Sequence, residues 1–65
     1  MLNKRGMTVN DRLEEDITFA ESTEDIEKRK MLSAKALGAA DLAVEFNLIS
    51  YNEWQNLIHR IFLIL

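Results

Sequence analysis

The sequence predicts an all-α protein in which a short N-terminal helix packs on a longer antiparallel helical hairpin. Three observations favour this fold: apolar residues recur at helical spacing in three segments, polar capping residues precede these segments, and only residues 47–49 separate the last two. We expect residues 1–7 to be mobile and residues 8–65 to form one domain, with helices at about residues 10–20, 24–46 and 51–64. Met7 offers a second translation start, which would leave out the first six residues.

The first predicted helix is amphipathic, with one narrow apolar side. Thr8 or Asn10 can cap it, because the side chains of both residue types accept hydrogen bonds from the free backbone N–H groups of a helix start. We expect its apolar side to cover the hairpin. The residues on that side are Val9, Leu13, Ile17 and Ala20.

The second predicted helix is apolar around most of its circumference, which is typical of a helix buried on several sides. Ser22 or Thr23 is its expected N-cap. Small residues in its middle, Gly38 among them, predict that a neighbouring backbone approaches closely there. One apolar face carries Leu32, Ala36, Ala39, Ala43 and Phe46, and an adjoining face carries Leu37, Ala40 and Val44.

The third predicted helix has the clearest start signal in the chain. Ser50 and Glu53 match the capping box, in which each side chain bonds the backbone N–H of the other residue. Asn47 is suited to the left-handed conformation that commonly ends the preceding helix, and the short connection favours an antiparallel hairpin. The apolar repeat that follows is Tyr51, Trp54, Ile58, Ile61 and Leu65, flanked by Leu57 and Phe62.

Residues 47–54, Asn-Leu-Ile-Ser-Tyr-Asn-Glu-Trp, with Leu57 beyond them, resemble the helix-turn-helix hairpin of short C-terminal oligomerisation (SHOCT) domains. The pattern of that family is Leu/Gly–Ile–Ser/Thr–x–x–Glu–aromatic. This chain has Asn47 where glycine is usual and lacks the paired lysines after the aromatic residue. The resemblance covers about the last third of the chain and implies a hairpin that takes part in oligomerisation. In composition the whole chain is similar to small acidic helical proteins encoded by phages and mobile elements of Gram-positive bacteria.

Composition limits the class of protein. With 65 residues the chain has room for one small core, and domains of this size commonly need disulfides, a metal or oligomerisation for stability. The absence of cysteine excludes disulfides and thiolate metal sites. No apolar run follows Lys4 and Arg5 as in a signal peptide, and none approaches the roughly 18 residues of a membrane span, so we expect a cytoplasmic protein.

The sequence predicts no catalytic, cofactor or metal site. His59 is the single histidine, and a transition-metal site normally takes three or four protein ligands. Asp41 and Glu45 lie one helical turn apart but lack the Glu-x-x-His pairs of helical carboxylate sites. No serine stands in a recognisable arrangement with a base, so we expect no enzyme activity.

Two alternatives involve anions. As a DNA-reading helix-turn-helix, the last helix would offer only His59 and Arg60 as cations, and a net charge of −3 opposes phosphate binding, so nucleic acid is not the expected partner. The other alternative is an oligomer that sequesters a small anionic ligand. The cations at its rim would be Lys28, Arg29, Lys35 and Arg60.

The preferred interpretation is protein association. Residues 61–65 are apolar all around the last helical turns, and one copy of a three-helix fold covers only one side of them. The protein then self-associates as a regulator or scaffold, or docks into a larger protein that it modulates or inhibits, as a phage-type inhibitor would. The predicted interface consists of Trp54, Ile58, Ile61, Phe62 and Leu65.

Overall fold

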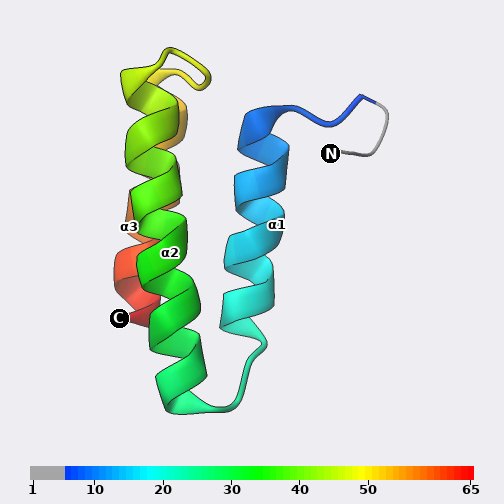
Figure 1. Cartoon of the computed structure of the whole chain (residues 1–65), viewed down its shortest axis with the longest axis vertical. Coiled ribbons are helices and arrows are strands. Elements are labelled where there is room, and N and C mark those ends of the chain that lie inside the picture. Colours follow the sequence, from blue (N-terminus) through cyan, green and yellow to red (C-terminus); the bar gives the residue numbers. More distant parts are fainter. Residues whose placement is uncertain (1–5) are drawn as a thin grey trace.

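Three packed helices make up the computed structural model, which describes residues 6–65. Helix α1 spans Val9–Glu21, α2 spans Ile26–Glu45 and α3 spans Tyr51–Ile64. Helix α2 runs antiparallel to both α1 and α3, and each helix contacts the other two (Figure 1). The predicted all-α, three-helix architecture is confirmed. The predicted mobile N-terminus falls largely on residues 1–5, which lie outside the described residues.

Helices α1 and α3 both begin with a complete capping box. The Thr8 hydroxyl accepts from the Asp11 N–H at 3.0 Å, and the Asp11 carboxylate accepts from the Thr8 N–H at 3.1 Å. At α3, the Ser50 hydroxyl accepts from the Glu53 N–H at 3.0 Å, and the Glu53 carboxylate accepts from the Ser50 N–H at 2.8 Å. Thr8 is therefore the cap of α1, and the prediction for Ser50 is confirmed.

The cap of α2 differs from the prediction. Asp25, not Ser22 or Thr23, is the N-cap, and its carboxylate accepts from the Lys28 N–H at 3.2 Å. The hydroxyls of Ser22 and Thr23 instead donate to the carbonyl of Phe19 at 3.0 and 2.9 Å. These two side chains satisfy a free carbonyl at the end of α1 and are not available to start the next helix.

The turn between α2 and α3 is a Schellman motif. Asn47 has the left-handed conformation, with φ 62°, as the sequence predicts. The Leu48 N–H donates to the Ala43 carbonyl at 2.8 Å, and the Asn47 N–H donates to the Val44 carbonyl at 3.1 Å. These two bonds close the end of α2 and reverse the chain within a few residues, so α3 returns alongside α2.

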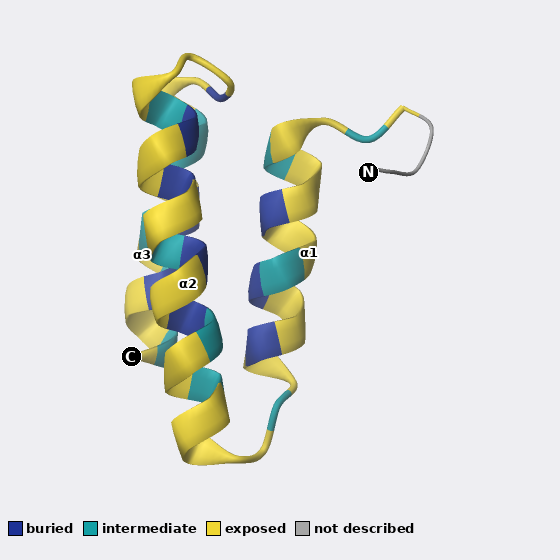
Figure 2. Ribbon diagram, in the orientation of Figure 1, coloured by how far each residue is buried: buried dark blue, intermediate teal, exposed yellow. Residues whose placement is uncertain are grey.

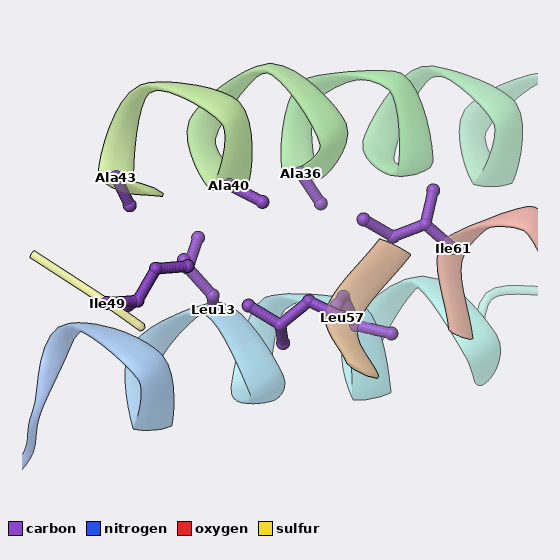
Figure 3. Close-up of a cluster of buried hydrophobic side chains, with 8 residues drawn as sticks. Leu13, Ala36, Ala40, Ala43, Ile49, Leu57 and Ile61 are labelled. Atoms are coloured by element: carbon purple, nitrogen blue, oxygen red, sulfur yellow. The ribbon is translucent and has the colours of Figure 1, made fainter. Parts of the chain in front are cut away.

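The core is built where large side chains of α1 and α3 pack on small side chains of α2 (Figure 3). Because alanine extends little from the helix, one side of α2 can receive two neighbouring helices at once. The core residues are Leu13, Ile17 and Ala20 of α1, Ala36, Ala40 and Ala43 of α2, Ile49 of the turn, and Leu57 and Ile61 of α3.

The buried side of α2 corrects two predictions. It consists of Ser33 and the three core alanines, whereas Ala39 and Phe46, expected on the buried face, are exposed. Gly38 is also exposed, and a Cβ added there would have no atom within 4 Å, so no backbone segment of residues 6–65 makes the predicted close approach at this glycine. Helix α2 has apolar residues on several sides, but α1 and α3 cover only one of them.

Candidate protein-interaction surface

An apolar stripe on α3 lies beside the residues that this helix contributes to the core. Leu57 and Ile61 point into the core, and the neighbouring side of the helix carries aromatic and aliphatic residues at steps of three and four. We call these residues the α3 stripe: Tyr51, Trp54, Ile58, Phe62 and Leu65.

The α3 stripe is fixed along one edge and open along the other. Trp54 and Ile58 are partly buried and pack against the core. Tyr51, Phe62 and Leu65 remain 63%, 61% and 49% exposed. The stripe therefore presents large apolar side chains to solvent from a helix whose inner side is fully packed.

The aromatic end of the stripe is held in place by two interactions. The indole Nε1–H of Trp54 donates to Oδ1 of Asp41 on α2 at 2.8 Å. The ring of Tyr51 stacks on Trp54, with centroids 5.4 Å apart and an interplanar angle of 30°. A hydrogen bond and a stacking contact together restrict the indole orientation, so less rotamer entropy remains to be lost on binding.

Ile61 has a different place from the other predicted interface residues. It is 0% exposed and belongs to the core between the three helices, so its side chain is not part of the accessible surface. Trp54, Ile58, Phe62 and Leu65 lie together on the stripe. Tyr51 joins them although the predicted interface omitted it, and its spacing of three from Trp54 is the signal that could have included it.

The four cations suggested for anion binding are in different situations. Arg60 donates from Nη2 to the Thr18 hydroxyl at 3.1 Å and to the Glu21 carboxylate at 2.9 Å, which ties α3 to α1. Arg29 donates from Nε to the Thr23 carbonyl at 2.9 Å. Both guanidinium groups thus serve the fold. The remaining two, Lys28 and Lys35, are exposed.

Lys35 lines a small pocket of about 130 Å³ between α1 and α2. Arg12 and Asp16 also line it, and Nε of Arg12 donates to Oδ1 of Asp16 at 3.3 Å. Phe19 contributes an apolar wall. Because a carboxylate already neutralises one of the two cations, the pocket offers little net positive charge to an anion.

The other polar residues considered for chemistry, His59 and Ser50, lie apart from one another. His59 is exposed on α3, and Ser50 is occupied by its capping box. Among residues 6–65 there is no group of three or more His, Asp or Glu side chains placed to hold a metal ion. Nor does any helix in this part of the chain have the length and apolarity to cross a membrane.

No protein-family model, curated protein or solved structure matches this chain. The resemblance of residues 47–54 to SHOCT hairpins stays a prediction that rests on those residues.

Proposed function

We propose that this protein is a non-catalytic helical interaction module that binds another protein chain through the α3 stripe and modulates it. The observation that carries the proposal is the exposure of Tyr51, Phe62 and Leu65 beside a complete core. In small monomeric proteins, large apolar side chains gathered on one surface usually mark a contact with another molecule.

The stripe has the features of a helix that binds in a groove. Its residues follow the spacing at which one side of a helix meets a partner groove. Tyr51 and Trp54 belong to the residue types that contribute most to binding energy, and their mutual stacking and the bond to Asp41 preorganise them. These properties favour binding over a role as an incidental apolar surface.

Charge around the stripe indicates the kind of groove. Asp41 lies at its aromatic end, where its carboxylate accepts from Trp54, and the whole chain has a net charge of −3. A complementary partner would have an apolar groove with cationic side chains at the end that receives Trp54. The acidic surface would increase the rate of encounter with such a site and make that rate fall with ionic strength.

The proposal is tested by comparing two aspartate variants of the full chain. Phe62→Asp changes the stripe, and Leu63→Asp makes the same kind of change at an adjacent residue that is 74% exposed and off the stripe. Each tagged variant is expressed in the source cells, and the chains recovered with it are quantified by mass spectrometry.

We expect the wild type and Leu63→Asp to retain the same associated chain, and Phe62→Asp to lose it. Because Phe62 and Leu63 are both exposed, both variants should keep the helical circular dichroism spectrum of the wild type. Equal recovery of that chain with Phe62→Asp and with the wild type would contradict the proposal, as would an equal loss with Leu63→Asp.

A further inference from the structure

Helix α2 has a second apolar side, which no other helix of residues 6–65 covers. It lies opposite the buried side formed by Ser33 and the core alanines. Figure 2 shows exposed positions along the length of the helix. We call the following exposed apolar and small residues the outer face of α2: Met31, Ala34, Gly38, Leu42 and Phe46. The exposed Lys35 lies among them at helical spacing.

This face combines large apolar ends with a small middle. Met31 and Leu42 are 65% and 57% exposed, whereas Ala34 and Gly38 between them project little from the helix. The buried side of the same helix shows what small residues allow, because its alanines admit the side chains of α1 and α3. The outer face therefore has the shape to receive another helix at short distance.

Charge is distributed unevenly along α2. Residues 26–35 contain four cations and one carboxylate, whereas residues 36–45 contain two carboxylates, Asp41 and Glu45, and no cation. A single helix prefers the opposite arrangement, since its N-terminus carries partial positive charge and its C-terminus partial negative charge. The cations of α2 thus stand at the less favourable end of their own helix.

The rest of the fold lowers the positive charge at one end of α2 and raises the negative charge at the other, so the two ends of the molecule still differ in the sign of their net charge. The start of α1 and the start of α3 both lie at the end of the molecule where α2 terminates (Figure 1). Residues 9–16 and 36–57, which form that end, contain seven carboxylates and one cation. Residues 17–35 and 58–65, toward the other end, contain four carboxylates and five cations. A complement for each end is available on a second copy of the chain.

We infer that the outer face of α2 pairs with the same face of a second copy, with the two α2 helices antiparallel about a two-fold axis near Gly38. This arrangement places the acidic end of each copy beside the cation-rich end of the other. With a two-fold axis between Leu37 and Gly38, Lys30 of one copy and Glu45 of the other lie at the same position along the helix axes. Symmetry gives this pair twice in the dimer. A parallel pair would instead place Lys30 opposite Lys30 and one acidic end beside the other.

Lys30 and Glu45 are suited to a test by charge exchange. Both side chains are exposed, and neither side chain has a hydrogen-bond or ion-pair partner among residues 6–65. In an antiparallel dimer, Lys30→Glu and Glu45→Lys each turn two attractions into repulsions, and the variant with both changes restores two attractions. In a parallel dimer each position faces its own copy, so neither single change alters the sign of the interaction.

The measurement is the dimer dissociation constant of the full chain, obtained by sedimentation velocity at low ionic strength. We expect each single variant to raise this constant about tenfold and the Lys30→Glu/Glu45→Lys variant to return it to within about threefold of the wild type. Leu42→Asp, on the outer face, should abolish the dimer while the helical circular dichroism spectrum is retained.

Three results would overturn the inference: a wild type that stays monomeric up to millimolar concentration, single variants that dimerise like the wild type, or a double variant as weak as the single ones. Phe62→Asp separates this inference from the proposed function. A dimer that is lost with Phe62→Asp but kept with Leu42→Asp would place self-association on the α3 stripe and contradict a role for α2.

Discussion

Replacing Ser33 by alanine should stabilise this protein. Ser33 is 0% exposed on the core side of α2, and its hydroxyl has no hydrogen-bond partner. A buried polar group without a partner costs about 1–3 kcal/mol, and alanine adds about 0.5 kcal/mol of helix propensity over serine. Removing one oxygen atom leaves a small gap that offsets part of this gain. The expected net increase in the free energy of unfolding is about 1–2 kcal/mol.

The assay is urea unfolding followed by circular dichroism, at one protein concentration for all variants. A gain of this size raises the urea midpoint with an unchanged m-value and raises Tm by about 4–16 °C for a domain of this length. Ala34→Ser is the matched control, because Ala34 is the next residue of α2 and is exposed. It should cost only the propensity difference of about 0.5 kcal/mol.

A destabilised Ser33→Ala variant would refute this reasoning. It would show that the hydroxyl is bonded in solution and contributes to the packing of α2. A gain no larger than the loss in Ala34→Ser would also refute it, because helix propensity alone would then account for the change.

Three further predictions concern stability and use the same unfolding measurement. Ala40→Leu should lower the free energy of unfolding by about 1–3 kcal/mol or more, because leucine overpacks the buried side of α2. Ala39→Leu, at the adjacent exposed position, should stay within about 0.5 kcal/mol of the wild type. Similar values for the two variants would contradict the burial of Ala40 in the core. Asn47→Ala should lower the free energy of unfolding by about 1 kcal/mol, whereas Asn47→Gly should leave it unchanged or raise it, because of these two residues only glycine adopts the φ of 62° without strain. An alanine variant as stable as the glycine variant would show that the turn does not need this conformation. Ser50→Ala should cost about 1 kcal/mol through loss of the α3 cap, and an unchanged midpoint would mean that the capping box adds nothing in solution.

The features that the sequence predicted best depend on residues close together in the chain. The capping box of Ser50 and Glu53 needs only residues three apart, and the left-handed turn at Asn47 follows from the residue type and the short connection. Both interactions join residues within about one helical turn of each other, so the spacing of residue types in the sequence is enough to predict them. The capping box and the turn were together enough to predict a hairpin of two antiparallel helices.

The buried side of α2 was harder to predict because this helix is apolar on several sides. Hydrophobic periodicity identifies an apolar face only where a polar face contrasts with it. Ala39 and Ala40 are adjacent and chemically identical, yet one is exposed and the other buried. The positions of α1 and α3 decide between them, and those positions follow from the packing of all three helices together.

The same limit applies to the interaction surface. Ile61 and Phe62 are neighbours within a wide apolar arc of α3, and both were assigned to the interface. The structure places Ile61 in the core and leaves Phe62 exposed. The α2 cap shows the limit for polar residues, because Ser22, Thr23 and Asp25 are all good capping types and the end of α1 engages the first two.

The binding role of the α3 stripe is tested most directly by photo-crosslinking in the source cells. A photoreactive phenylalanine analogue replaces Phe62 in one version of the full chain and Leu63 in another. Both positions are exposed on the last turns of α3, but only position 62 lies on the stripe. The proposed function predicts a covalent adduct with another protein chain from position 62 and little or none from position 63. No adduct from position 62, or equal yields from both positions, would contradict it.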